Sequence, residues 1–342
     1  MRFETPFLWF TTQVNGGVRV WDVVQVDGLM VNAYEILQAD HIARNVRGMG
    51  VHRYLGYDGL IIMDSGGYHF SKTKDVDAKV ESLLLLYEKS RPDLAVVLDH
   101  PIAPNLPVDE AKRRIEKTLE YTRVMVERRR FDLPELVPAI HGYDEQTLRY
   151  VIDSINKIGD FDVYAVGSLV SWQAQSMWGQ GIVEVARIVA LAKSMLYNKI
   201  LHAFGVAKTH TTPILFYAGA DSLDTISWIM QAVYGKIHLP ASGGIDFSVR
   251  ATQGRRPKLN PREARLLEEC DCPVCRRHGW EVLRVDSKAR AMHNAWVYQK
   301  EMNHIRELMK TGEFERWVWR LYGRHPVYRE ALRVADKIRR KV

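Results

Sequence analysis

The stretch Phe216-Tyr217-Ala218-Gly219-Ala220-Asp221-Ser222-Leu223-Asp224-Thr225 places two carboxylates three residues apart at the end of a short apolar run. Ionised groups are costly to remove from water, so buried apolar segments seldom end in an acid that has no partner. Either aspartate alone could simply cap the helix expected from about Thr225 onward. Other apolar runs of the chain also end in Asp, His or Gly, and this repetition favours a reaction centre that contains Asp224.

Short apolar runs alternate with amphipathic stretches along the chain, which is the pattern of βα units around a parallel sheet. Eight strands are expected, at residues 29–33, 60–64, 95–99, 137–141, 163–167, 200–204, 216–220 and 237–241. Helical spacing of apolar residues predicts helices between them, among others at 75–89, 109–129, 144–157 and 182–196. The sequence therefore predicts an α/β protein with a (β/α)₈ TIM barrel, whose active site lies at the C-terminal ends of the strands.

The residues that close the expected strands are polar or rich in glycine. The ends are Asp64-Ser65-Gly66-Gly67-Tyr68, Asp99-His100-Pro101, His141-Gly142, Gly167-Ser168-Leu169 and Phe204-Gly205. A barrel gathers such ends around one mouth, so we expect a pocket there with Asp64, Asp99, His141 and Asp224. Glycines at this rim let the backbone approach a flat ligand. Helix capping is the alternative explanation for each polar end taken singly.

All three cysteines of the chain lie within Cys270-Asp271-Cys272-Pro273-Val274-Cys275. This spacing is typical of a metal site, and three thiolates need a fourth tetrahedral ligand. We expect His293, on a helix that returns past the cluster, to complete a structural zinc site. His278 is the second choice because it follows Cys275 closely, and a redox or free-thiol cluster is the remaining alternative.

The composition of the 342 residues, 46% hydrophobic and 26% charged, is that of a globular protein with a sizeable core. Gly, Arg, Lys and Pro gather from about residue 250 onward, so we divide the chain there. Residues 1–250 are expected to form the catalytic barrel, and residues 251–342 the zinc-binding subdomain and C-terminal helices.

A formal net charge of +7 makes a polyanionic partner plausible. Basic clusters occur at Arg255-Arg256, at Arg276-Arg277 and at 337–341. No apolar run approaches the length of a bilayer, and Met1-Arg2-Phe3-Glu4 lacks the pattern of a secretory signal. We therefore expect no membrane partner and a cytoplasmic location.

Taken in order, these motifs resemble the tRNA-guanine transglycosylase family. The resembling segments are Asp64-Ser65-Gly66-Gly67, Asp99, Gly167-Ser168-Leu169, residues 202–205, residues 219–224, the cysteine cluster and His293-Asn294. Each is weak alone, and the ordered set is specific. The resemblance implies a (β/α)₈ barrel with a zinc-binding subdomain and an exchange of bases in a nucleic acid.

The resemblance also implies roles for single residues. Asp224 corresponds to the nucleophile that attacks C1′ of a nucleotide, displaces guanine and forms a covalent glycosyl-enzyme. Asp64 corresponds to the acid/base residue, because two inversions at one carbon need a second group that handles protons. The corresponding base-binding residues are Asp99, Ser65, Gly66, Gly67, Tyr68, His141, Gly142, Gly167, Ser168 and Leu169, with Tyr68 as one stacking wall.

The sequence also departs from the family pattern. Tyr68-His69 stands where the family has an aromatic residue and Gln, and His141-Gly142-Tyr143 stands where it has Gln-Gly-Gly. Some paralogues act on DNA, and these departures place DNA slightly ahead of tRNA as the expected polymer. The incoming base is expected to be free 7-cyano-7-deazaguanine or a relative, with the pocket for its 7-substituent near residues 166–169. A homodimer through the zinc region is an open possibility.

Two readings from other classes compete with base exchange. One is a non-catalytic nucleic-acid-binding partner subunit, against which the presence of both Asp64 and Asp224 argues. The other is an unrelated barrel hydrolase with a structural zinc.

Overall fold

The computed structural model describes residues 3–70, 79–130, 134–171 and 181–341. Within this part of the chain, one parallel sheet has the strand order β5-β4-β3-β2-β1-β9-β8-β7-β6. Its strands are β1 (Phe7–Thr11), β2 (Gly28–Asn32), β3 (Leu60–Asp64), β4 (Leu94–Val96), β5 (Glu135–Val137), β6 (Ala139–Ile140), β7 (Val163–Val166), β8 (Ile200–Ala203) and β9 (Ser222–Thr225).

The sheet closes on itself through Pro138, the single residue between β5 and β6. Proline lacks a backbone N–H, so it interrupts the ladder at this point. The N–H of Val97 donates to the Val137 carbonyl, and the N–H of Ala165 donates to the Pro138 carbonyl, both at 3.0 Å. β5 and β6 thus form one broken strand that joins β4 to β7. The expected (β/α)₈ barrel is confirmed.

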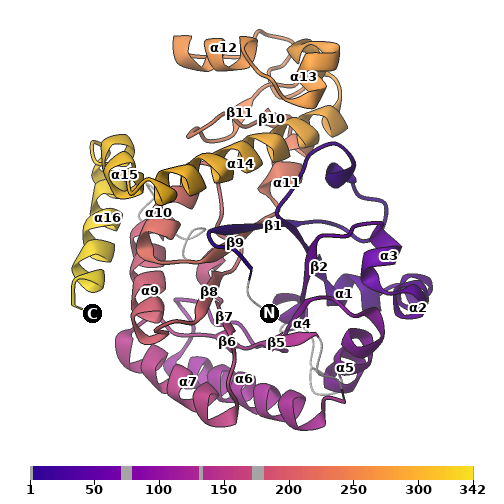
Figure 1. Ribbon diagram of the computed structural model, residues 1–342, viewed down its shortest axis with the longest axis vertical. Coiled ribbons are helices and arrows are strands. Elements are labelled where there is room, and N and C mark those ends of the chain that lie inside the picture. Colours follow the sequence, from indigo (N-terminus) through magenta and orange to yellow (C-terminus); the bar gives the residue numbers. More distant parts are fainter. Residues whose placement is uncertain (1–2, 71–78, 131–133, 172–180, 342) are drawn as a thin grey trace.

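Helices surround the barrel (Figure 1). They are α1 (Ala33–Leu37), α2 (Asp40–Met49), α3 (Val51–Leu55), α4 (Gly67–Phe70), α5 (Lys79–Ser90), α6 (Val108–Arg128), α7 (Glu145–Ile158), α9 (Gly181–Met195), α10 (Thr212–Ala218) and α11 (Ser227–Val233). The expected helices at 109–129, 144–157 and 182–196 correspond to α6, α7 and α9 within one residue at each end. The first residues of the expected helix at 75–89 lie outside the described residues.

The inside of the barrel follows the two-residue period of its strands. Phe7, Trp9, Met30, Ile62 and Val163 belong to one apolar cluster inside the sheet. Gly28 makes room for the two largest rings, because a Cβ there would lie 2.8 Å from atoms of both Phe7 and Trp9. Toward the C-terminal ends of the strands, the inward-facing positions are occupied by polar residues, and these residues form the mouth of the barrel.

Two of the eight expected strands are wrong. Residues 216–220 belong mainly to helix α10, which has Pro213 in its first turn and ends at Gly219 with a φ of 109°. All seven residues of α10 are buried, and a fully buried helix and a buried strand give the same apolar run. The strand of this unit is β9, and the missed eighth strand is β1.

The expected strand at 237–241 also lies elsewhere. Only β10 (Lys236–Ile237) is extended, and it pairs antiparallel with β11 (Ile245–Asp246) outside the barrel sheet. Residues of this hairpin pack with the cysteine region: Ile237 and Phe247 share one apolar cluster with Leu267, Cys272 and Cys275. The division of the chain at residue 250 remains a prediction.

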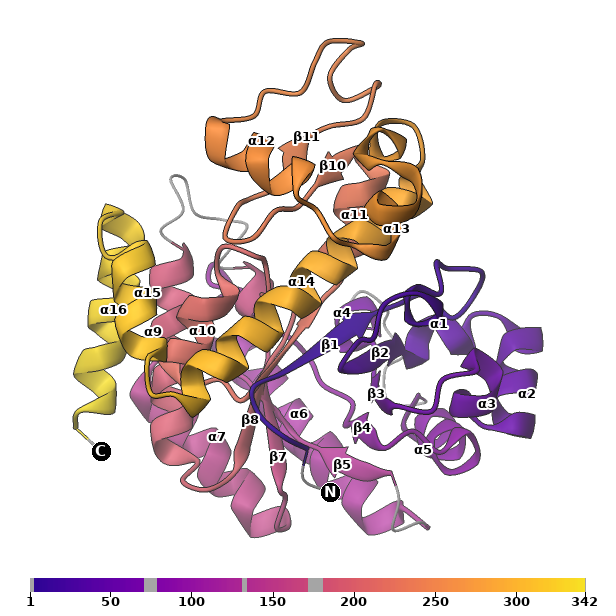
Figure 2. The ribbon, with the colours of Figure 1, turned by 45° about the horizontal axis from the view of Figure 1, so that its top comes forward.

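The C-terminal part contains α12 (Pro261–Glu268), α13 (Pro273–His278), α14 (Ser287–Lys310), α15 (Phe314–Tyr322) and α16 (Pro326–Arg339). α14 runs from the cysteine region across the barrel toward α10 (Figure 2). It packs against α11 and β1, whereas α16 packs against α9. The long helix therefore ties the zinc-binding subdomain to the barrel.

Candidate active site and zinc cluster

The C-terminal ends of the strands surround a cavity of about 560 Å³, a size typical of ligand pockets. Three carboxylates reach it from β3, from the loop after β4 and from β9. Its lining residues are Thr11, Met30, Asp64, Gly67, Asp99, Pro101, Ile102, Ala103, Arg114, Gly167, Ser168, Val170, Ser171, Phe204, Gly205 and Asp224. The mouth predicted from the strand ends therefore exists.

Asp224 lies in β9 with only 6% of its surface exposed. One carboxylate oxygen accepts a hydrogen bond from the Gly205 N–H at 2.5 Å, and the other accepts from the Thr11 hydroxyl at 3.2 Å. Nε2 of the buried His202 lies 3.4 Å from the first oxygen. These contacts fix the direction of the carboxylate.

Asp64 ends β3, where the Asn32 side-chain amide donates to it at 2.9 Å and the Gly66 N–H at 3.3 Å. The pKa of Asp64 is raised to about 7, mainly by burial and in addition by the nearby charges of Asp99 and Asp224. A carboxyl group with this pKa can both give and take a proton near neutral pH.

Asp99 is held from behind by two side chains. The Ser65 hydroxyl donates to one of its oxygens at 3.1 Å, and His141 Nε2 lies 3.0 Å from the other. His141 Nδ1 lies 2.9 Å from the hydroxyl of Ser168, which also accepts from the Ile102 N–H at 2.9 Å. This network assigns the proton on His141 to Nε2, so that the ring donates to Asp99.

Glycine is required at one position of this arrangement. A Cβ on Gly67 would lie 1.9 Å from the Asp99 carboxylate. The backbone of Gly67 can therefore sit against Asp99 only because it carries no side chain.

The predicted base-binding residues divide into two groups. Asp99, Gly67, Gly167 and Ser168 line the cavity together with Asp64 and Asp224. Ser65, Gly66, His141, Gly142 and Leu169 do not line it: Ser65 and His141 support Asp99, and Gly142 packs against Thr147 and Leu148 of α7. The backbone of Tyr68 belongs to α4, and its side chain lies outside the described residues.

Several cavity residues were missed from the sequence. Thr11 belongs to the missed strand β1, so its inward position could not be found. Met30 of β2 supplies an apolar wall and was also missed, whereas Phe204, directly after β8, was among the predicted strand ends. Arg114 comes from α6, and helical spacing alone gave no signal that it turns toward the strand ends.

The three cysteines and His293 form a compact cluster suited to a structural zinc ion, with all four ligand atoms within 4.8 Å of one another. His293 Nδ1 lies 3.5, 3.5 and 3.7 Å from the sulfurs of Cys270, Cys272 and Cys275. Zinc bonds of about 2.3 Å to sulfur and 2.0 to 2.1 Å to nitrogen at a tetrahedral angle require roughly 3.6 Å. The choice of His293 over His278 is confirmed.

A hydrogen bond outside the cluster orients the histidine ligand. His293 Nε2 lies 3.0 Å from the carbonyl oxygen of His238, so Nε2 carries the proton and Nδ1 faces the thiolates. Cys272, directly before α13, and Cys275, in the first turn of α13, are both buried. The site therefore has four protein ligands and needs no water, as expected of a structural ion.

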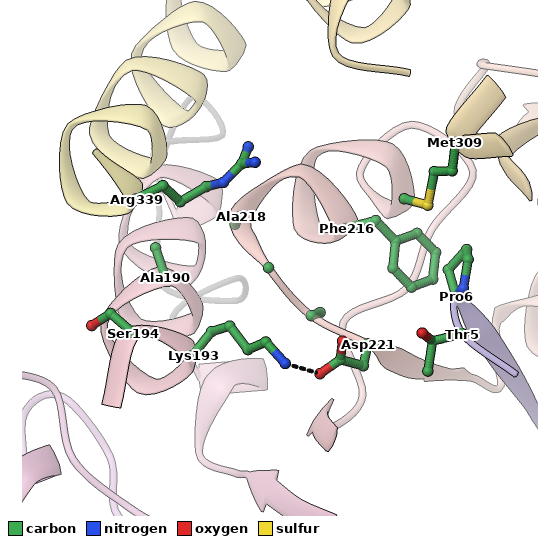
Figure 3. Close-up of a pocket in the computed structure, with 12 residues that line it drawn as sticks. Thr5, Pro6, Ala190, Lys193, Ser194, Phe216, Ala218, Asp221, Met309 and Arg339 are labelled. Atoms are coloured by element: carbon green, nitrogen blue, oxygen red, sulfur yellow. Dashed lines mark hydrogen bonds and ion pairs between the residues drawn. The ribbon is translucent and has the colours of Figure 1, made fainter. Parts of the chain in front are cut away.

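Asp221 lies at the other end of β9, away from this cavity. Lys193 of α9 donates to it at 2.6 Å, and the Leu201 N–H donates at 2.7 Å. Figure 3 shows this pair at the edge of a separate cavity of about 380 Å³, with Arg339 of α16 facing the same space. Asp221 thus ties α9, β8 and β9 together.

Comparison with known proteins agrees with this geometry. Three archaeal proteins named tRNA-guanine(15) transglycosylase are among the similar sequences. The protein of Methanopyrus kandleri is 28% identical over 84% of this chain and 59% of its own length. That of Methanococcus aeolicus is 25% identical over 97% and 50%, and that of Nanoarchaeum equitans is 26% identical over 88% and 66%.

The chain spans about half the length of most of the curated relatives it matches. Among the described residues, no helix is both long and apolar enough to span a membrane. The model of the family described as queuine tRNA-ribosyltransferase matches residues 1–327, which include the barrel, the three carboxylates and the cysteine cluster. On this match, the chain belongs to the queuine tRNA-ribosyltransferase family.

Proposed function

We propose that this protein exchanges guanine in a polynucleotide for a free 7-deazaguanine base, through a covalent bond between C1′ and Asp224. The observation that carries the proposal is the meeting of Asp64, Asp99 and Asp224 on one cavity at the C-terminal end of the barrel. Membership of the family supports the same class of reaction.

Asp224 is proposed as the nucleophile. Its carboxylate attacks C1′ while the bond between C1′ and the guanine nitrogen breaks, which inverts the carbon once. Attack by the incoming base breaks the ester bond and inverts the carbon again, so the original configuration returns. The hydrogen bonds from Gly205 and Thr11 aim the carboxylate without consuming all its lone pairs.

Asp64 is proposed to move the proton. With a pKa of about 7 it is partly protonated at neutral pH, so it can protonate the leaving guanine. The resulting carboxylate then takes the proton that the incoming base loses when its nitrogen bonds to C1′. Asp64 gives one proton to the leaving guanine and takes one from the incoming base, so it ends the cycle in its starting protonation state.

Asp99 is proposed to select the base. Its two oxygens each keep a free lone pair beyond the contacts to Ser65 and His141, and guanine offers two adjacent N–H donors on one edge. Phe204 and Met30 provide apolar surface against the flat ring. The target nucleotide must leave its stack to reach this depth.

The choice of polymer rests on the relatives and on the sequence. The names of the archaeal relatives favour tRNA. The sequence departures at His69 and His141 favoured DNA, and His141 supports Asp99 rather than lining the cavity. We therefore propose tRNA as the first polymer to test and DNA as the second.

The test is incorporation of radiolabelled guanine into unmodified tRNA and into double-stranded DNA, followed by mass spectrometry of nucleosides after incubation with 7-cyano- or 7-aminomethyl-7-deazaguanine. Wild type should incorporate base into one polymer and form a complex that survives denaturing electrophoresis, whereas Asp224→Ala should do neither. If wild type incorporates no base into either polymer but still binds one of them, the non-catalytic alternative replaces the proposal.

A further inference from the structure

Arg114 lines the catalytic cavity together with the three carboxylates. Arg114, in the first turns of α6, reaches the cavity with 22% of its side chain exposed. Its Nε donates to Glu110 at 2.8 Å, and one terminal nitrogen donates to the Pro101 carbonyl at 2.9 Å. These two bonds hold the guanidinium against the loop that follows β4.

Hydrogen bonds divide the polar groups of the cavity into three sets. Asp224 lies with Thr11 and Gly205. Asp99 lies beside Gly67, where Ser65 and His141 hold it. Arg114 lies with the segment Pro101–Ile102, which Ile102 joins to Ser168. The guanidinium is thus associated with the side formed by residues 101–103 and 167–171.

A guanine ring has three edges: one carries the glycosidic nitrogen, one carries the two N–H donors, and one carries O6 and position 7. If the glycosidic nitrogen faces Asp224 and the two N–H donors face Asp99, the remaining edge carries O6 and position 7. That edge then faces the side of the cavity that includes Ser168, Val170 and Arg114. A charge on the 7-substituent would therefore be placed toward a guanidinium.

We propose that Arg114 selects the incoming base by the charge of its 7-substituent, favouring an electron-rich acceptor such as a nitrile over an ammonium group. This inference rests on the proposed function. Like charges repel, and a partly enclosed site screens this repulsion less than bulk water does, although the ion pair with Glu110 offsets part of the Arg114 charge. A nitrile nitrogen, in contrast, can accept a hydrogen bond from the guanidinium.

The experiment compares the two bases in each variant of the complete chain. The quantity measured is the ratio of kcat/KM for 7-cyano-7-deazaguanine to kcat/KM for its 7-aminomethyl analogue. Arg114→Gln should lower this ratio about tenfold, the order of one partly screened charge interaction. Arg114→Lys keeps the charge and should retain most of the ratio. Damage to the loop alone would lower both values of kcat/KM together and leave the ratio unchanged.

Arg113→Gln is the matched control, because Arg113 is the next residue on α6 and pairs with the same Glu110. Its side chain is 60% exposed and is absent from the cavity lining. Its ratio should equal that of wild type. Guanine exchange is measured in parallel: if wild type exchanges no guanine, the proposed function fails. If guanine exchanges but Arg114→Gln keeps the wild-type ratio, only the role of Arg114 is overturned.

Discussion

Asp221 directly precedes β9 and Asp224 lies near the C-terminal end of the same strand, and the two carboxylates have different surroundings. Asp221 forms an ion pair with Lys193 and accepts a backbone N–H, so its charge is compensated within the protein. Asp224 is more deeply buried and accepts hydrogen bonds from two neutral donors, the Gly205 N–H and the Thr11 hydroxyl. A carboxylate of the second kind retains the capacity to react.

The surroundings of each end extend the contrast. At the Asp224 end, three acids share one cavity, where burial and then the charges of Asp99 and Asp224 raise the pKa of Asp64. At the Asp221 end, Lys193 forms an ion pair with the acid (Figure 3), whereas Arg339 pairs with Glu315 and donates to the Tyr217 carbonyl. In barrels of this kind, the C-terminal ends of strands serve chemistry and the N-terminal ends serve stability. The four predictions below test that division.

Asp224→Asn is expected to have the largest effect, because an amide cannot form the glycosyl ester. Removal of a nucleophile typically lowers kcat by about 10⁴-fold or more. The measurement is incorporation of radiolabelled guanine. Asp221→Asn is the matched control and should retain activity within a few-fold, since Asp221 lies outside the cavity. Equal losses in both variants would contradict the division between the two ends.

Asp64→Asn should change how the free energy of unfolding depends on pH. The unfolded carboxyl ionises near its ordinary pKa of 3.8, whereas the folded one ionises near 7. Between these values the folded state binds the extra proton, so this group lowers stability progressively as the pH rises from about 4 to 7. At about 1.4 kcal/mol per pKa unit, the full difference is roughly 4 kcal/mol.

The amide does not ionise, so urea unfolding should show Asp64→Asn gaining on wild type between pH 4 and 7, with a constant difference above. All other groups titrate in both proteins and cancel. A difference in the free energy of unfolding that stays constant across this range would mean that the pKa of Asp64 is not raised in the folded protein.

Gly67→Ala should disturb base binding by displacing Asp99. The added methyl group would start 1.9 Å from the carboxylate, so one of the two must move. We expect kcat/KM to fall by roughly ten- to a hundredfold, in line with about 1.4 kcal/mol per factor of ten. Kinetics at several base concentrations measure it. Activity equal to wild type would show that Asp99 need not hold its present position.

Gly219→Ala should have the smallest effect, and only on stability. Gly219 ends α10 with a φ of 109°, a conformation that a residue with a side chain adopts at a cost of about 1 kcal/mol. Thermal unfolding should show a Tm a few degrees lower with unchanged guanine exchange. A large loss of exchange would mean that this end of β9 is coupled to the chemistry.

Periodicity found most of the barrel, because exposed helix faces and buried strands differ over long segments. α6, α7 and α9 and the strand β3 were predicted almost to the residue. The errors fall where a segment is buried on all sides. α10 was taken for a strand because a short apolar run has no polar face to reveal its period.

The zinc cluster was predictable because its ligands are chemically distinctive and close in sequence. Three cysteines within six residues restrict the choice to a fourth ligand, and His293 was correctly chosen. The cavity was harder, since its walls come from separate strands. Asp64, Asp99 and Asp224 were found as strand ends, while Thr11 and Arg114 carry no such mark.

The sequence by itself determined the barrel, the metal cluster and the set of acids at the strand ends, because each leaves a local pattern of spacing or residue type. Only the tertiary structure decided that His141 and Ser65 stand behind Asp99, that Arg114 reaches the cavity and that Asp221 belongs to the opposite end. These are distances between segments far apart in the chain, and they depend on how the strands register and how the helices pack.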